Sequence, residues 1–317
     1  MLERQSPGGR RRRLSVLASR AVDPLARLGQ ALAEAGYAFV TPTPETHRRV
    51  LARGGEARTL RDVFGWSRPF ARGALPQRLF DLLEEAGAVE SAGPLLRSRV
   101  RFSSLGPLLL AHSAYPTTAA DAICLGPDTY RFASFVQSRA PPRIASLADV
   151  GCGTGAGGLL LASRAGSVQL LDVNPSALRF ARANCELNGI PAVVEQSDVL
   201  SGAAGALDLI IANPPYLADP LRRAYRDGGG DLGTGLSLRI VREALERLRP
   251  GGRLLLYTGT AVVEGEHLLQ QWLAPLLEGV PHEYFELDPD VFGEELENPP
   301  YAAADRIAVV GLDALRP

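Results

Sequence analysis

The fold class follows from one short stretch of the chain, "DVGCGTGAGG" at Asp149–Gly158. An apolar segment typical of a buried strand, residues 146–150, leads into it, and an Ala- and Leu-rich segment typical of a helix follows. Its glycines at 151, 153 and 155 allow the backbone to approach a ligand closely, and the N-terminus of a helix favours electron-rich groups. A strand, a glycine loop and a helix in this order predict a parallel α/β sheet that binds a ligand beyond the carboxyl ends of its strands.

The same alternation of strand and helix patterns continues to the end of the chain. Beyond the first strand we expect six more, at 167–173, 191–196, 207–212, 250–259, 282–287 and 305–312. We expect helices from 155 onward and at 174–189, 235–248 and 264–279. The helix at 174–189 has the clearest ends, because Asn174 and Pro175 suit a cap and first position and Gly189 suits a stop. Repeated βα units predict a doubly wound, mostly parallel, seven-stranded sheet over residues 121–317.

The first 120 residues follow a different pattern. Residues 23–89 have the periodicity of several short helices, whereas residues 94–116 alternate and break at Gly106-Pro107, which predicts a β-hairpin. A winged-helix-like module and a small helical cap on the next domain both fit. We expect an accessory, substrate-recognition domain over residues 21–120. The basic segment 1–20 lacks the apolar core of a secretory signal, so we expect a disordered tail there.

The composition argues against several classes of function. No apolar run approaches the roughly 20 residues of a membrane span. The three cysteines and four histidines are widely spaced, which argues against a zinc site or a disulfide framework and fits a reducing cytoplasm. The chain has no lysine, so lysine-dependent chemistry is excluded. Residues 1–145 hold 21 Arg against 12 acidic residues (+9), and residues 146–317 hold 13 against 23 (−10), which suggests different partners for the two halves.

An acid at the end of the second strand, Asp172, indicates the kind of ligand that the glycine loop binds. A carboxylate there accepts hydrogen bonds from both hydroxyls of a ribose, so loop and acid together predict a nucleoside cofactor. The pattern Gly-x-Gly-x-x-Ala from residue 151 also fits NAD-binding proteins, and a glycine turn without a ligand stays open. Two acids favour S-adenosylmethionine. Asp149 is placed to meet a cationic amino group, and Asp198, after the third strand, to accept the adenine amino group.

The tetrapeptide Asn-Pro-Pro-Tyr occurs twice, at Asn213–Tyr216 and Asn298–Tyr301. The first copy directly follows the fourth strand, at the edge where ligands of open α/β sheets bind. The second copy precedes the last strand and would form a turn at the start of it. We therefore expect the candidate active site at Asn213–Tyr216 and a structural or lid-like loop at Asn298–Tyr301.

The first copy suits methyl transfer to a planar nitrogen. An amide or aromatic NH₂ is a poor nucleophile, because its lone pair is delocalised. The Asn213 side-chain oxygen and the Pro214 carbonyl can each accept one N–H, which fixes the nitrogen and directs its lone pair toward a methyl group. Pro215 stiffens the loop, and Tyr216 is expected to stack on a flat substrate group. Orientation and electrostatics then allow in-line transfer without a strong base.

Residues from about 123 to 312 resemble the class I S-adenosylmethionine-dependent methyltransferases of the NPPY type, which have a Rossmann-like fold. The stretches that carry this resemblance are LGPDTYRF (125–132), DVGCGTG (149–155), LLDVNPSAL (170–178) and LIIANPPY (209–216). The chain most resembles the HemK-like protein-(glutamine-N5) methyltransferases, which modify peptide release factors. The first 120 residues match that family poorly, and the glycines of GGGDLGTG after the first NPPY are more numerous than in the family.

The resemblance implies S-adenosylmethionine as cofactor and no metal. Pro127-Asp128-Thr129 matches the segment that in this family lies over cofactor and substrate. The residues expected to contact the cofactor are Thr129, Asp149, Gly151, Cys152, Gly153, Gly155, Asp172, Val173, Asp198, Val199 and Asn213.

The expected enzyme is a cytoplasmic methyltransferase (EC 2.1.1) that acts on a glutamine amide in a release factor-like protein, with no membrane partner. The alternative acceptor is adenine N6 or guanine N2 in rRNA, tRNA or DNA, since enzymes for those amines share the motif and the basic N-terminal half attracts phosphate. A protein that only binds RNA or the cofactor needs no amine-orienting loop. A nicotinamide oxidoreductase would need a catalytic His, Ser or Tyr–Lys pair that the chain does not place near the loop.

Overall fold

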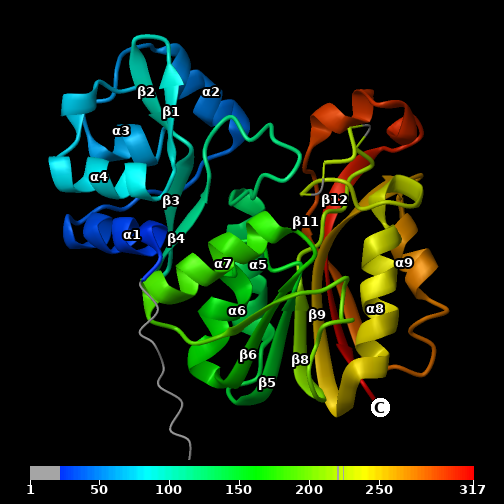
Figure 1. The fold of residues 1–317 in the computed structure, drawn as a ribbon. Coiled ribbons are helices and arrows are strands. Elements are labelled where there is room, and N and C mark those ends of the chain that lie inside the picture. Colours follow the sequence, from blue (N-terminus) through cyan, green and yellow to red (C-terminus); the bar gives the residue numbers. More distant parts are fainter. Residues whose placement is uncertain (1–21, 220, 224) are drawn as a thin grey trace, which may run out of the picture.

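The structure, a computed structural model, describes residues 22–219, 221–223 and 225–317. A central sheet with helices on both faces forms the larger part of the molecule, and a smaller module of helices and hairpins lies against one side of it (Figure 1). The predicted basic tail, residues 1–20, lies outside the described residues. Throughout the described ranges, every helix is too short or too polar to span a bilayer.

The central sheet has the strand order β7-β6-β5-β8-β9-β12-β11, and the two-residue β10 pairs with the end of β9. In chain order its strands are β5 (Ile144–Val150), β6 (Ala165–Asp172), β7 (Val193–Gln196), β8 (Leu207–Ala212), β9 (Leu248–Val263), β10 (Glu266–His267), β11 (His282–Asp288) and β12 (Arg306–Leu315). The strands from β7 to β9 run parallel, whereas β12 and β11 run antiparallel to their neighbours. This arrangement confirms the predicted Rossmann-like, doubly wound, mostly parallel sheet and adds the short β10.

The strand order reverses between β5 and β8, because β6 and β7 extend from β5 to one side and β8 lies on the other. Val150 and Ala212, the last residues of these two strands, are paired neighbours. The glycine loop and the first NPPY therefore leave the sheet side by side, at the topological switch point where open α/β sheets bind ligands.

Helices cover both faces of the sheet because its strands are apolar on both sides. On one face lie α5 (Pro127–Arg139), α6 (Ala156–Leu161) and α7 (Pro175–Asn188), and on the other α8 (Gly235–Arg247) and α9 (Leu268–Leu273). In β8, Leu209 and Ile211 pack in the core of the first face, and Ile210 and Ala212 in that of the second. The helix predicted at 264–279 is shorter than expected, because β10 takes its start and Pro275 lacks the N–H that a longer helix needs.

The N-terminal module combines short helices with two hairpins. Its helices are α1 (Pro24–Glu34), α2 (Pro44–Ala52), α3 (Leu60–Phe64) and α4 (Gln77–Glu85), and its hairpins are β1–β2 (Val89–Ala92, Leu95–Ser98) and β3–β4 (Val100–Leu105, Leu108–Ser113). The 3₁₀ turn η1 (Arg72–Ala74) also belongs to this module. The larger domain contains the 3₁₀ turns η2 (Ala162–Arg164), η3 (Asp231–Gly233), η4 (Gly293–Glu297) and η5 (Pro299–Tyr301). The hairpin predicted around Gly106-Pro107 is confirmed as β3–β4, and the hairpin β1–β2 was not predicted.

Two asparagines of α7 attach the module to the larger domain. Asn184, which is fully buried, accepts a hydrogen bond from the Ala111 N–H of β4 at 2.7 Å and donates to the Ala111 carbonyl at 3.0 Å. One turn later, Asn188 makes the same pair of contacts with Leu109. Asn184 also donates to the Thr154 carbonyl in the glycine loop at 2.9 Å. One side chain therefore connects the module with the predicted cofactor loop.

Candidate active site

The glycine loop after β5 requires glycine for its backbone conformation. Gly151, Gly153 and Gly155 have φ values of 66°, 54° and 80°, in the left-handed region that other residues rarely adopt. Gly155 is also the N-cap of α6. A Cβ on Gly151 would meet nothing within 4 Å, so the space above the loop is open. The loop is a cradle of glycine backbone at a helix N-terminus, which suits a nucleoside cofactor.

Two carboxylates predicted to bind the cofactor lie at this loop. Asp172, at the end of β6, accepts hydrogen bonds from the N–H groups of Gly153 and Asn174, both at 2.9 Å, and so fixes the loop against the start of α7. Asp149 is buried beneath the loop and accepts the Gly158 N–H at 2.8 Å. The pKa of Asp149 is raised to about 7, mainly by burial and to a smaller extent by the charge of the neighbouring Asp172. The predicted contacts of these carboxylates with ribose and amino group stay predictions.

The remaining predicted cofactor residues differ in their exposure. Val173 follows β6 with 59% of its surface exposed, so its apolar side chain is open to a ligand. Cys152 and Val199 are buried, and Val199 has a φ of 53°. Asp198 is exposed and pairs with Arg239 of α8 at 2.7 Å, so an adenine contact would compete with that ion pair. The described residues contain no cluster of His, Cys, Asp and Glu that could hold a metal ion.

The first NPPY continues directly from β8. Pro214 is buried, whereas Asn213 and Pro215 are half-buried. Within the described residues, the Asn213 side chain makes no hydrogen bond that meets the usual geometric limits, so its amide is available to a substrate. Since Ala212 is the paired neighbour of Val150, Asn213 lies next to the start of the glycine loop. The structure thus brings the predicted acceptor-orienting amide and the predicted cofactor loop together.

Tyr216 differs from its predicted role. The ring is 6% exposed, packs on Gly259 of β9 so closely that a Cβ there would lie 2.2 Å from it, and contacts Phe292 edge-on. The predicted stacking on a flat substrate group is therefore not supported by this packing. The Tyr216 hydroxyl instead donates to Asp128 at 2.5 Å. Burial and the neighbouring Asp128 keep the pKa of Tyr216 well above its usual value, so the hydroxyl stays a proton donor.

Asp128 was not among the predicted site residues, although it belongs to the Pro127-Asp128-Thr129 segment that the resemblance placed over cofactor and substrate. It lies in the first turn of α5, beside the predicted cofactor residue Thr129, whose hydroxyl accepts the Gly126 N–H. Its carboxylate also accepts hydrogen bonds from Tyr257 at 3.2 Å and Arg131 at 3.1 Å. Asp128 thereby attaches the NPPY loop to α5 and β9. Its presence in the family-like stretch LGPDTYRF was the one available signal.

The glycine-rich stretch after the first NPPY packs against it from the side of α8. A Cβ on Gly233 would lie 2.5 Å from the carbonyl oxygen of Tyr216, and one on Gly228 would lie 1.8 Å from the carbonyl oxygen of Gly233. Gly233 also has a φ of 76°. The many glycines of this stretch are thus explained by a close crossing of two backbone segments directly below the candidate site.

Comparisons with known proteins agree with this geometry. Residues 133–274 match the family model described as "Methyltransferase small domain". A release factor glutamine methyltransferase of Deinococcus radiodurans is 39% identical over 120 residues, covering 34% of this chain and 43% of that protein. A ribosomal RNA small subunit methyltransferase C of Chromohalobacter salexigens is 37% identical over 108 residues, covering 34% of this chain and 29% of that protein. In each case the match spans less than half of the relative's own length.

Among solved structures, the 16S rRNA N2 G1207 methyltransferase of T. thermophilus matches 78% of this chain and 64% of its own, with 19% identity and a TM-score of 0.45. The glycine cradle with its carboxylates, its position at the switch point and the family match all concern the same segment. Residues 133–274 of this chain are thus similar to the class I, S-adenosylmethionine-dependent methyltransferases of the small-domain family.

Proposed function

We propose that the chain transfers a methyl group from S-adenosylmethionine to a planar nitrogen, and that the acceptor is a glutamine side-chain amide in a protein such as a peptide release factor. The observation that carries the proposal is the amide of Asn213, which makes no hydrogen bond within the described residues. It lies beside the glycine loop because Val150 pairs with Ala212. The bound cofactor supplies an electrophilic methyl group on a sulfonium. The chain itself has to hold the acceptor nitrogen in line with that methyl group.

The residues of the site divide this task. Gly151, Gly153 and Asp172 would hold the cofactor at the loop, with Val173 against its adenine. The Asn213 side-chain oxygen and the Pro214 carbonyl would each accept one N–H of the acceptor NH₂, which directs the lone pair toward the methyl group. Removal of the proton needs no strong base. The amide nitrogen carries a positive charge once it has accepted the methyl group, so its N–H is acidic and loses the proton readily.

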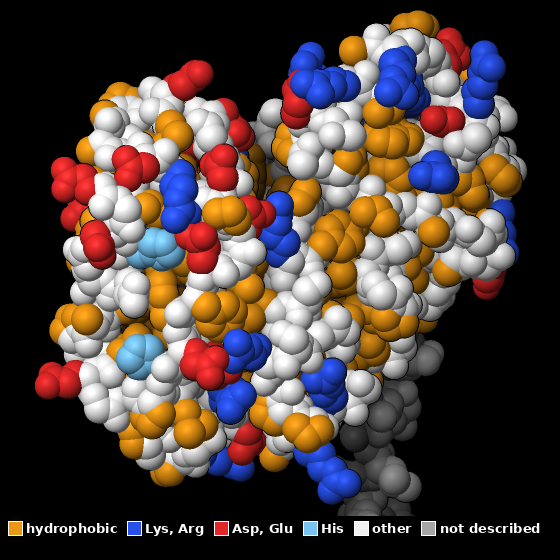
Figure 2. Space-filling model, turned by 180° about the vertical axis from the view of Figure 1, so that it is seen from behind, with side chains coloured by type: hydrophobic (Ala, Val, Ile, Leu, Met, Phe, Trp, Pro, Cys, Tyr) orange, Lys and Arg blue, Asp and Glu red, His pale blue; other side chains and the backbone are white. Residues whose placement is uncertain are grey.

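A nucleic-acid amine is the second candidate acceptor, and one observation favours it. Arg53, Arg58, Arg61 and Arg99 of the N-terminal module are exposed and form no ion pair with any described residue. Figure 2 shows basic side chains gathered on the lobe of this module and acidic ones on the opposite lobe, with a hollow between the two lobes. Arginines without an ion-pair partner among the described residues would attract phosphate. The curated relatives are likewise named for both acceptors.

A labelling experiment tests the proposal and separates the two acceptors. The chain is incubated with tritiated S-adenosylmethionine and either a purified release factor or small ribosomal subunits, and the counts are then released with protease or nuclease. We expect protease-sensitive label in the release factor. Nuclease-sensitive label would favour the second acceptor, and label in neither would reject both.

The substitution Asn213→Ala tests the site. We expect it to lower kcat at least about a hundredfold, because it removes one of the two acceptors that orient the substrate nitrogen. Cofactor affinity, measured by calorimetry, should stay within about twofold of the unsubstituted chain. Full turnover by Asn213→Ala would show that the NPPY site is assigned wrongly.

A further inference from the structure

The chain that follows the first NPPY forms a closed loop. The Leu217 N–H donates to the Arg226 carbonyl at 3.0 Å, and the Gly228 N–H donates to the Leu217 carbonyl at 2.9 Å, so the loop leaves and returns at one point. Inside it, Asp219 is 5% exposed and accepts hydrogen bonds from the backbone N–H and guanidinium of Arg223. The base of this loop begins at Leu217, directly after Tyr216, so its position limits where NPPY can lie.

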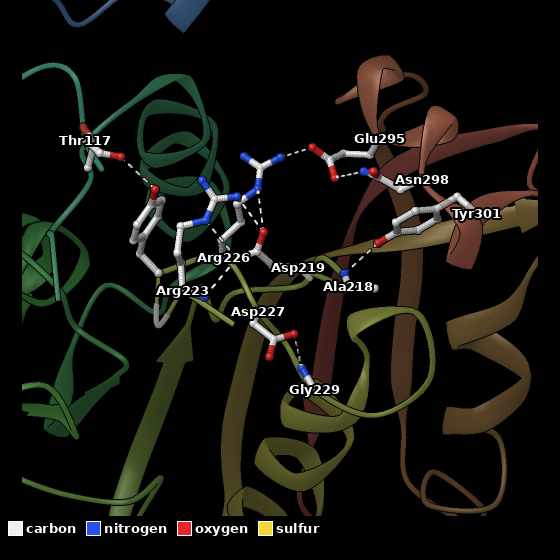
Figure 3. Close-up of polar contacts among 11 residues, drawn as sticks. Thr117, Ala218, Asp219, Arg223, Arg226, Asp227, Gly229, Glu295, Asn298 and Tyr301 are labelled. Carbon is white, nitrogen blue, oxygen red and sulfur yellow. Dashed lines mark hydrogen bonds and ion pairs between the residues drawn. The ribbon is translucent and has the colours of Figure 1, made fainter. Parts of the chain in front are cut away.

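The second NPPY holds this loop from the other side (Figure 3). The buried Tyr301 hydroxyl accepts the Ala218 N–H at 2.9 Å. The Asn298 side chain donates to Glu295 at 2.8 Å, and the other oxygen of Glu295 pairs with Arg226 of the loop. The amide nitrogen of Asn298 is therefore engaged in a structural contact, which distinguishes this copy from Asn213.

The contacts join the segment between β11 and β12 to the candidate site. Phe292, just before η4, contacts the Tyr216 ring at a centroid distance of 6.0 Å and lies under the Arg226 guanidinium at 5.6 Å. Glu295 is 7% exposed, so its pairing with Arg226 is shielded from water. On the far side of the loop, the Tyr225 hydroxyl donates to the Thr117 carbonyl of the segment before α5. The loop is thus held on two sides by groups that are distant from it in sequence.

We propose that Tyr301 and the Arg226–Glu295 pair are positioning residues for the first NPPY. They fix the loop that follows Tyr216 and thereby keep Asn213 and Pro214 where the acceptor nitrogen must bind. The duplicated motif is then a support for the site and not a second site. The catalytic effect of these residues rests on the proposed function. The contacts of Ala218 and Arg226 with the η4–η5 segment, which we call the clamp, do not depend on it.

The test uses the full chain with Tyr301→Phe and a matched control, Tyr284→Phe. The control also loses one tyrosine hydroxyl, which on β11 contacts His267 at 3.3 Å and lies outside the loop. We expect Tyr301→Phe to speed hydrogen exchange of the Ala218 amide at least about tenfold, because its acceptor is lost. We also expect kcat to fall about ten- to a hundredfold, with cofactor affinity and the KM for S-adenosylmethionine unchanged. Tyr284→Phe should change neither the exchange nor kcat.

Glu295→Gln provides a second variant if Tyr301→Phe folds poorly. It keeps the shape of the side chain but removes the charge opposite Arg226, and we expect the same separation of kcat from KM. Unchanged exchange at Ala218, or equal kcat losses in Tyr301→Phe and Tyr284→Phe, would overturn the clamp. A chain that methylates neither the release factor nor the ribosomal subunits would reject the proposed function, and the exchange measurement would still decide on the clamp.

Discussion

The two asparagines of the duplicated motif show that environment, not local sequence, decides what a residue can do. Asn213 leaves a parallel strand at the switch point with its amide uncommitted within the described residues, whereas Asn298 donates its amide N–H to Glu295. The second copy contacts the loop that follows the first, because β12 runs antiparallel to β9, with Arg306 paired to Val262 near the end of β9. The start of β12 therefore lies at the same edge as the end of β8.

At the residue scale, the raised pKa of Asp149 predicts a pH-dependent cofactor affinity. The pKa is about 7, against an ordinary 3.8, because burial penalises the carboxylate. Below pH 7 the folded chain holds a neutral carboxyl, and a cation bound next to it favours ionisation. We therefore expect S-adenosylmethionine to bind more tightly as pH rises from 5.5 to about 7.5, by up to about tenfold per pH unit below the pKa, with release of a proton.

Calorimetry in two buffers of different ionisation enthalpy counts that proton. Asp149→Asn still accepts the Gly158 N–H and should bind without proton release and with little pH dependence. Equal proton release by both proteins would contradict the contact. Without cofactor the sign is opposite: the raised pKa means that the free energy of unfolding falls as pH rises from about 4 to 7, and Asp149→Asn should remove this loss.

At the scale of elements, α7 stabilises both the accessory module and the cofactor loop. Asn184 satisfies the N–H and the carbonyl of Ala111 and the carbonyl of Thr154, and all three contacts are buried. We expect Asn184→Ala to lower the free energy of unfolding by about 1–3 kcal/mol, because these buried groups lose their partner. Urea denaturation measures the change.

Asn188 is a matched control for this prediction. It makes the same pair of contacts with Leu109 but is only half-buried, so water can replace it. We expect Asn188→Ala to cost less than about 1 kcal/mol and to leave cofactor affinity unchanged. Asn184→Ala should also weaken cofactor binding through Thr154. If the two substitutions cost the same, the contribution of Asn184 to the glycine loop is smaller than the contacts indicate.

The sequence predicted those elements whose signals are local. Asn174, Pro175 and Gly189 mark the ends of α7, and the structure shows the Asn174 cap and a left-handed Gly189. The length of α9 was overestimated, because residues that fit a helical pattern form the β10–β9 hairpin instead, in which Glu266 pairs with Val263. The hairpin β1–β2 was missed, because its four-residue strands give too little alternation to detect.

The candidate site was predictable to the same extent. The glycine loop, Asp172 and Asn213 are recognisable because each lies at the end of a strand or directly after it. The contact between Asp128 and Tyr216 joins residues 88 positions apart, and no local pattern encodes it. The buried position of Tyr216 depends on Gly259, which belongs to another strand. Contacts of this kind are set by the packing of distant elements and become visible only in the folded chain.

At the scale of the whole molecule, the accessory module has its own core but shares part of it with the larger domain. Its buried cluster of helix and hairpin side chains includes Ala183 of α7, with Phe180 and Leu187 packed against it. Gly29 of α1 approaches Leu187 so closely that a Cβ would lie 2.6 Å from it. The boundary expected at residue 120 remains a prediction, but loss of the module would expose this face of α7.

Two buried histidines make the module sensitive to acid. His47 and His112 are each 1% exposed, and burial lowers the pKa of His47 to about 4 and that of His112 well below its usual value, with the charge of Arg101 adding to both effects. The unfolded chain takes up these protons near pH 6.5 and the folded chain does not, so the free energy of unfolding should fall as pH drops from about 6.5 to 4.

Trp66, whose carbonyl contacts His47, reports on the module once the other tryptophan is removed by Trp272→Phe. We expect the Trp66 fluorescence transition in urea to move to lower urea between pH 7 and 4.5, and to move less in a chain that also carries His112→Asn. An equal shift in both proteins would mean that protonation elsewhere destabilises the module.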